Sequence, residues 1–134
     1  VVVQRQILEL LMNMQKRFNL SLLFISHDIS TLVDFSDRIA IMYAGRLMEI
    51  AETKRFLDNP LHPYTKGLIK SLTGFVRKGE RLWSIPGAPP DLAEEIPGCR
   101  FKPRCPEGDD QCTLKKPELV EIEPGHYVAC IKAI

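Results

Sequence analysis

Residues 37–46 read DRIAIMYAGR, and this stretch gives the clearest indication of the fold. Residues 38–43 and residues 46–50 are both rich in apolar side chains of the kind that strands favour. Ala44-Gly45 lies between the two runs, and a short connection that contains glycine is typical of a β-hairpin. The pattern therefore predicts two strands joined by a tight turn.

A helix is predicted near the start of the chain, over residues 4–17. Apolar residues recur there at spacings that place them on one face of a helix: Val3, Ile7, Leu10, Leu11, Met14 and Phe18. Asn19 is expected to end this helix. Residues 21–26, SLLFIS, then predict a short buried strand of the continuous apolar kind that parallel sheets contain.

Three further helices complete the regular part of the chain. A short helix capped by Asp28 or Ser30 is expected to follow the strand. After the hairpin, residues 52–57 predict another short helix, and Pro63 suits the first turn of a last one. The order helix, strand, helix, strand, strand, helix indicates an α/β fold.

The composition changes along the chain and indicates two parts. Eight of the ten prolines lie between Pro86 and Pro124, and all four cysteines lie in the last 36 residues. Residues 1–73 are expected to form one domain with regular structure. Residues 74–134 are expected to form a linker, over residues 74–80, and a loop-rich, cysteine-containing extension. Such an extension buries little apolar surface, so it needs a cross-link such as a disulfide or a bound metal.

Charge and hydropathy exclude several classes of protein. Lys and Arg number 18 against 17 Asp and Glu, so the net charge of +1 provides no basic arm for nucleic acid and no acidic tail. The apolar runs, such as residues 22–25, are far shorter than the about 20 residues that a membrane span needs. No signal peptide is visible, and a start at Val1 rather than Met suggests a chain cut from a longer one.

Ser26-His27-Asp28 is the first candidate site. It follows the predicted strand, and ligands of open α/β sheets bind beyond the carboxyl ends of strands. His27 would there donate a hydrogen bond to a phosphate oxygen or hold a reacting water. The alternative is a histidine that only caps the next helix. The three residues do not form a hydrolase triad, because triad members meet from distant positions in the chain.

Four cysteines form the second candidate site: Cys99, Cys105, Cys112 and Cys130. Two disulfides would suit a secreted chain, but no export signal is visible. Zinc prefers ligand pairs separated by about two to four residues, and no such pair exists here. An iron–sulfur cluster tolerates more varied spacings, and Arg100, Lys102 and Arg104 would offset its negative charge. Structural thiols without a metal are the remaining alternative.

Together these motifs resemble the end of an ABC transporter ATPase domain. Ser26-His27-Asp28 followed by residues 37–46 is similar to that region, with His27 at the place of the family's switch histidine. Residues 59–65, NPLHPYT, look like the signature of the branch that imports oligopeptides and dipeptides. Residues 98–106, GCRFKPRCP, and residues 123–130, EPGHYVAC, resemble that branch's C-terminal extension. The resemblance covers essentially the whole chain.

The resemblance implies an ATPase that powers peptide import at the cytoplasmic face of the cell membrane. ATP and Mg²⁺ would be its cofactors, and His27 would contact the γ-phosphate, so it is both the catalytic and the cofactor-binding candidate. The four cysteines would ligate a [4Fe–4S] cluster. The partners would be a second ATPase subunit, transmembrane permease subunits and, indirectly, a peptide-binding protein. No nucleic acid is expected.

The phosphate-binding motifs of such an ATPase are not in this sequence. The Walker A loop, the signature sequence and the Walker B strand would all lie upstream. These 134 residues alone are therefore expected to bind ATP negligibly and to be inactive. An unpaired strand at residues 21–26 would invite self-association. The alternative function is a metal- or iron–sulfur-stapled interaction module without a catalytic role.

Overall fold

The computed structural model describes residues 2–72 and 84–133 of the 134-residue chain. Its contacts divide into two compact units, Val1–Asp37 and Arg38–Ile134, which are described separately. The expected linker over residues 74–80 lies outside the described residues. In the described ranges, no helix is both long enough and apolar enough to cross a membrane.

The first unit holds two helices, α1 (Val2–Phe18) and α2 (Ile29–Phe35). The predicted first helix is confirmed, and Asn19 ends it in a left-handed conformation with φ of 50°. The N–H of Leu20 donates back to the carbonyl of Gln15 at 3.0 Å, which closes the last turn. The predicted second helix is also confirmed, and Asp28 is its cap.

Residues 21–26 do not form a strand, so the prediction of a buried strand there is wrong. The side chains of Leu23 and Ile25 are 91% and 87% exposed. A strand needs a neighbour for its backbone N–H and C=O groups, and within the described residues no strand pairs with this stretch. The expected self-association remains a prediction, and it now rests on these exposed apolar side chains rather than on a strand edge.

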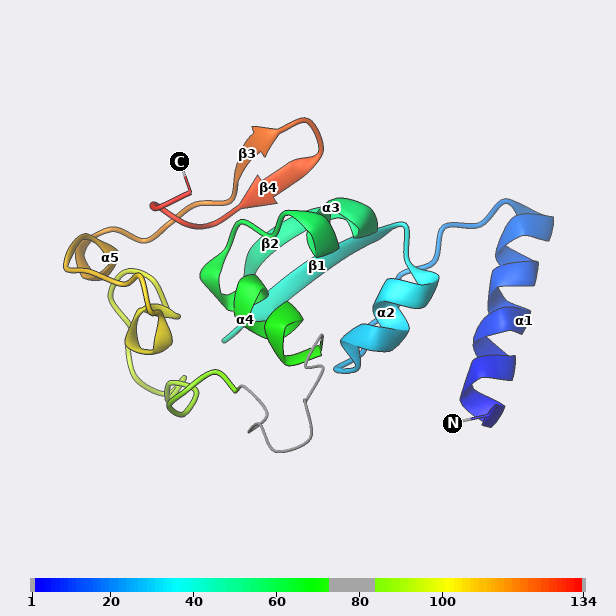
Figure 1. Ribbon diagram of the computed structural model, residues 1–134, viewed down its shortest axis with the longest axis horizontal. Coiled ribbons are helices and arrows are strands. Elements are labelled where there is room, and N and C mark those ends of the chain that lie inside the picture. Colours follow the sequence, from blue (N-terminus) through cyan, green and yellow to red (C-terminus); the bar gives the residue numbers. More distant parts are fainter. Residues whose placement is uncertain (1, 73–83, 134) are drawn as a thin grey trace. The chain divides into compact units, whose positions relative to one another are not determined.

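An antiparallel sheet organises the second unit. The predicted hairpin is confirmed as β1 (Arg38–Tyr43) and β2 (Arg46–Glu52). In its turn, Ala44 and Gly45 have φ of 50° and 75°, the positive values that a two-residue hairpin turn favours. A second hairpin consists of β3 (Val120–Glu123) and β4 (His126–Val128). Because β4 pairs with β2, the four strands form one sheet in the order β1-β2-β4-β3 (Figure 1).

Short helices accompany this sheet. The two predicted helices that follow the hairpin are confirmed as α3 (Thr53–Asp58) and α4 (Pro63–Leu72), and both contact β2. Two single turns, η1 (Lys102–Arg104) and α5 (Gln111–Leu114), lie among the loops that carry the cysteines. The second unit is therefore α/β, with its helices and turns connected by long irregular segments.

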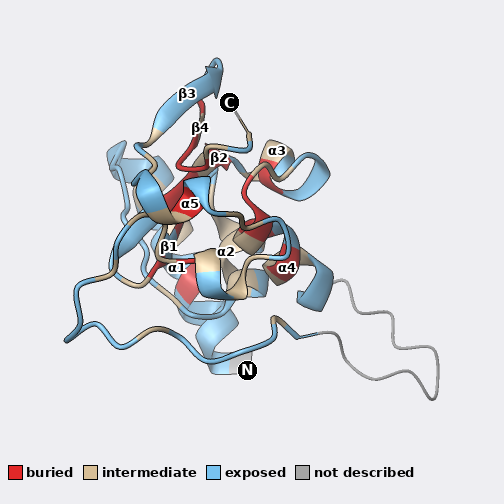
Figure 2. Cartoon of the chain, turned by 90° about the vertical axis from the view of Figure 1, so that its left-hand side faces the viewer, coloured by how far each residue is buried: buried red, intermediate tan, exposed pale blue. Residues whose placement is uncertain are grey.

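The core of the second unit joins residues from distant segments. Alternate side chains of β1 point inward, so Ile39, Ile41 and Tyr43 are buried. Tyr43 also packs with Tyr64 of α4 and with Phe101, at distances of 4.7 and 5.2 Å between ring centroids. In Figure 2 the buried residues include parts of β2, α3 and α4, whereas β3 is exposed along its length. The first hairpin and the cysteine loops thus share one core.

Candidate functional site

His27 lies exposed in the first unit, directly before the cap of α2. Asp28 provides that cap, because its carboxylate accepts the N–H of Ser30 at 3.1 Å and the N–H of Thr31 at 3.4 Å. A hydrogen bond from the Thr31 hydroxyl is the main reason why the pKa of Asp28 is below its usual value. The capping role considered for His27 therefore belongs to Asp28, and the imidazole of His27 stays accessible.

All four cysteines line one cavity in the second unit, although they come from separate loops: Cys99, Cys105, Cys112 and Cys130. All four are free thiols, and the last two are buried. The cavity has a volume of about 10 Å³, which is room for about one water molecule. Among the described residues, no group of three or more His, Cys, Asp or Glu side chains is already arranged so that it could hold a metal ion.

A close backbone contact joins two of the cysteine loops. The N–H of Cys99 donates to the carbonyl of Cys112 at 2.7 Å. The preceding residue, Gly98, has φ of 69°, and a Cβ atom there would stand 2.2 Å from the Cys112 carbonyl oxygen. Glycine permits both the backbone conformation and the close approach. The backbone therefore fixes the spacing between Cys99 and Cys112.

Backbone N–H groups are directed at three of the thiols. Each donor lies two or three residues after the cysteine: Phe101 and Lys102 for Cys99, Glu107 for Cys105, and Lys132 and Ala133 for Cys130. Burial outweighs these hydrogen bonds and raises the pKa of all three thiols, that of Cys105 to about 11. At neutral pH these thiols are therefore protonated unless a cation stabilises them.

The cations at the cavity differ from those expected. Lys102 lines the cavity, and so does Lys132. Arg100 and Arg104 instead donate to backbone carbonyls of the hairpin turn and of residues 85–86. The two lysines are thus the basic side chains at the cavity, and the two arginines hold neighbouring loops in place.

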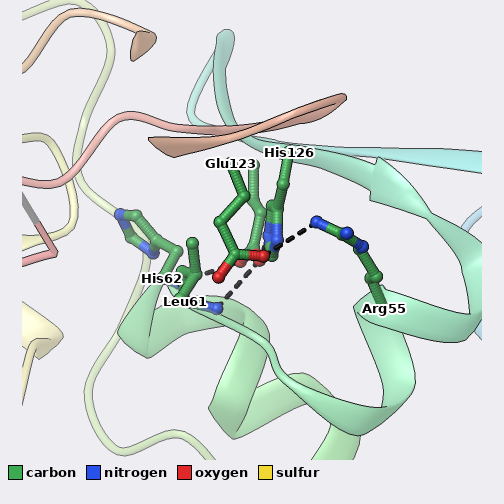
Figure 3. Close-up of polar contacts among 6 residues, drawn as sticks. Arg55, Leu61, His62, Glu123 and His126 are labelled. Carbon is green, nitrogen blue, oxygen red and sulfur yellow. Dashed lines mark hydrogen bonds and ion pairs between the residues drawn. The ribbon is translucent and has the colours of Figure 1, made fainter. Parts of the chain in front are cut away.

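A buried carboxylate organises the loop that precedes α4. Glu49 of β2 is fully buried, and its two oxygens accept the N–H of Leu61 at 2.8 Å and the N–H of His62 at 2.9 Å. Its Oε1 also lies 2.7 Å from Nε2 of His126, at the start of β4 (Figure 3). One side chain therefore connects β2, β4 and the loop that carries His62.

His62 is buried with one ring nitrogen unpartnered. Its Nδ1 accepts the N–H of Tyr64 at 3.0 Å, and burial lowers the pKa of the imidazole to about 4, against the opposing effect of Glu49. The ring is therefore neutral at pH 7, and its proton is on Nε2. That Nε2 is buried and has no hydrogen-bond partner among the described residues. Figure 3 shows the ring directed away from Glu123 and His126.

Acid is expected to destabilise the second unit through His62. The pKa of its imidazole is about 4 in the fold and near 6.5 in the unfolded chain. The unfolded chain binds more protons between these values, so the free energy of unfolding falls by up to about 3 kcal/mol as the pH decreases from about 6.5 to about 4. Denaturant titrations at several pH values should show this loss. His62→Gln, which cannot titrate, should have a smaller slope, and equal slopes would contradict the assignment.

Comparison with known proteins finds a family that is similar to part of this unit. Residues 48–112 match the family described as oligopeptide/dipeptide transporter, C-terminal region. These residues, just under half of the chain, are similar to that family. The matched residues of the transporter region include Glu49, His62 and three of the four cysteines, whereas His27 and Cys130 lie outside them.

Curated relatives extend the similarity along nearly the whole chain. The dipeptide transport ATP-binding protein DppD of Caldanaerobacter subterraneus is 37% identical over 97% of the chain. The putative oligopeptide transport ATP-binding protein YkfD of Bacillus subtilis is 43% identical over 97% of it. The oligopeptide transport ATP-binding protein OppD of Escherichia coli is 37% identical over 100% of it. The chain spans 40% of the length of each of these relatives.

The role of Glu49 in this transporter region is not evident from the sequence pattern. The pairing of β1 with β2 shifts register after Ile41, so the consecutive residues Met48 and Glu49 of β2 are both buried. A bulge of this kind breaks the alternation that marks inward-facing positions. The one available signal is a single carboxylate within the otherwise apolar residues 47–51.

Proposed function

We propose that this chain is the C-terminal part of an ATP-hydrolysing subunit that powers oligopeptide or dipeptide import across the cytoplasmic membrane. The similarity of nearly the whole chain to ATP-binding subunits of peptide transporters carries this proposal. Residues 1–73 would belong to the ATPase domain and residues 74–134 to a linker and cysteine-containing extension. The partners would be a second ATPase subunit, the permease subunits and, indirectly, a peptide-binding protein, at the cytoplasmic face of the membrane.

His27 is the residue of this chain that we assign to the ATPase reaction. ATP with Mg²⁺ supplies the phosphoryl group that is transferred to water in such enzymes. The exposed imidazole of His27 would donate a hydrogen bond to a γ-phosphate oxygen, where negative charge develops during the reaction. Two observations support this role: the side chain is accessible, and Asp28 already performs the capping.

His27→Ala in the intact subunit is expected to reduce ATP hydrolysis by about 100- to 1,000-fold, as removal of one charge-stabilising donor does in other enzymes. ATP binding should be largely retained, because a phosphate-binding loop provides most of the affinity. Hydrolysis by the assembled transporter and nucleotide binding by calorimetry measure the two effects. Asp34→Asn, an exposed change on α2, is the matched control. Hydrolysis at the normal rate in His27→Ala would refute the assignment.

We further propose that Cys99, Cys105, Cys112 and Cys130 ligate a [4Fe–4S] cluster. A bound cluster would join the loops of the second unit through four thiolate bonds and so act as a staple. The donor set suits such a group in number and chemistry, because four thiols face one cavity and backbone N–H groups point at three of them. The cavity itself holds about one water molecule, so the thiols must move apart to admit a cluster core.

Anaerobic preparation is expected to give a brown protein with iron and sulfide in about equal amounts, as a cubane with four thiolate ligands requires. Cys112→Ser should lose most of the iron, because it removes one buried ligand. Thr113→Ser is the matched control, since it changes the adjacent residue and leaves the thiols intact. Metal analysis and visible absorption measure the result. One zinc per chain without sulfide would show that the site binds a single ion instead, in keeping with its small cavity.

A further inference from the structure

We propose that His62 donates a hydrogen bond from Nε2 to a sulfur atom of the group held by the four cysteines. This inference rests on the cluster proposed above and adds a residue that is not a ligand. Hydrogen bonds to sulfur are one of the means by which a protein sets the reduction potential and stability of a bound cluster. His62 would therefore tune the bound group without touching iron.

The hydrogen-bonding pattern identifies Nε2 as a donor. The N–H of Tyr64 donates to Nδ1 of His62 at 3.0 Å, so Nδ1 carries a lone pair and not a proton. In a neutral imidazole the proton then sits on Nε2. The backbone N–H of His62 is itself held by Glu49 at 2.9 Å, so the loop presents the ring from a fixed position.

Nε2 of His62 has no acceptor where burial requires one. The residue is only 1% exposed, so bulk solvent does not replace the missing partner. An unsatisfied buried donor destabilises the fold, and such groups in native proteins usually have a structural or functional reason. A ligand that supplies the acceptor would remove this cost.

The cavity indicates which ligand would supply the acceptor. His62 lines the same cavity as all four cysteines, together with Phe101, whose ring centroid lies 5.7 Å from that of His62. Among the residues that the structure describes, the other buried side-chain polar atoms without a partner are the Thr65 hydroxyl and Nδ1 of His126, and neither residue lines the cavity. His62 is therefore distinguished by lining the sulfur-rich cavity. Thiolate and sulfide sulfurs of a bound cluster carry negative charge and accept hydrogen bonds.

Three variants of the anaerobically prepared chain test this inference. In His62→Asn the amide oxygen takes the place of Nδ1, so the N–H of Tyr64 keeps an acceptor while the donor at Nε2 is lost. In His62→Gln the amide nitrogen extends toward the place of Nε2 and keeps a donor. Thr65→Val is the matched control, because it removes a buried hydroxyl that does not line the cavity.

We expect His62→Asn to lower the reduction potential and to weaken iron retention by about 10- to 100-fold, the usual effect of removing a partner outside the ligand set. If the preference for the reduced cluster weakens tenfold, the reduction potential falls by about 59 mV in a one-electron couple. Potentials come from redox titration followed by electron paramagnetic resonance, and iron retention from the rate of loss to a chelator. His62→Gln and Thr65→Val should stay close to the unmodified protein.

The outcomes separate the two proposals. A fully loaded His62→Asn with unchanged potential and unchanged iron loss overturns the role of His62 and leaves the cluster proposal standing. Absence of iron and sulfide from the unmodified protein overturns the cluster proposal, and the inference falls with it.

A measurement on the unmodified protein covers the case in which His62→Asn does not fold. With ¹⁵N-labelled histidine, pulsed electron paramagnetic resonance of the reduced cluster should detect a weak nitrogen coupling that is lost in His62→Gln. A loaded, unmodified protein without this coupling overturns the inference.

Discussion

Gly98→Ala is expected to lower the free energy of unfolding by about 3 kcal/mol or more, because two penalties act together. The new Cβ would lie 2.2 Å from the Cys112 carbonyl oxygen and 2.5 Å from that of Thr113, so the backbone of α5 must move. The residue would also keep a φ of 69°, which L-residues adopt at a cost of about 1–2 kcal/mol. The shift would break the bond between the Cys99 N–H and the Cys112 carbonyl.

Gly125→Ala is the control that separates the two penalties. Its φ of 76° imposes a similar conformational cost, but a Cβ there would meet no atom within 4 Å among the described residues. Its effect should therefore be about 1–2 kcal/mol. Urea denaturation of both variants measures the difference, and equal losses would show that the close approach at Gly98 is not rigid.

Glu49→Ala is expected to cost about 3–5 kcal/mol, the range seen when one partner of a buried polar pair is removed. The change leaves the N–H groups of Leu61 and His62 and the His126 ring without their acceptor, in a place that water does not reach. Glu49→Gln should lower the free energy of unfolding by less, about 1–3 kcal/mol, because its amide oxygen still accepts from some of these donors. It cannot accept from all of them, so part of the loss remains.

Glu123→Gln is the matched control for Glu49. Glu123 accepts a hydrogen bond from Arg55 at 2.8 Å, but both side chains of this pair are more than 40% exposed. Exposed ion pairs contribute about 0–1 kcal/mol, so this variant should be close to neutral. If Glu49→Gln were equally mild in denaturant titrations, the carboxylate would not be organising the loop.

Local signals in the sequence predict much of the fold. The structure confirms the turn at Ala44-Gly45, the end of α1 at Asn19 and the start of α4 at Pro63. All three depend on backbone preferences of the residues themselves. The strand expected at residues 21–26 is absent, because an apolar run becomes a strand only where a pairing partner is available. The apolar pattern is the same whether the segment pairs with a strand or stays unpaired, so the sequence cannot distinguish these two outcomes.

The sequence likewise predicts part of the candidate sites and misses the rest. The sequence identifies the four cysteines as a set, and the structure places all of them around one cavity. The sequence does not reveal that β4 pairs with β2, because that contact joins segments far apart in the chain. The contact of Glu49 with His126 and the position of His62 beside the four cysteines both depend on such distant contacts.

The addition of β4 to β2 also sets an order of events during synthesis. Glu49 and His126 are separated by 77 residues, so at about 5–20 residues per second the carboxylate leaves the ribosome several seconds before its imidazole partner. Until then the edge of β2 is hydrated and the loop at Leu61 and His62 has only part of its final surroundings. The first hairpin and α3 are therefore synthesised several seconds before the strand that completes the edge of β2.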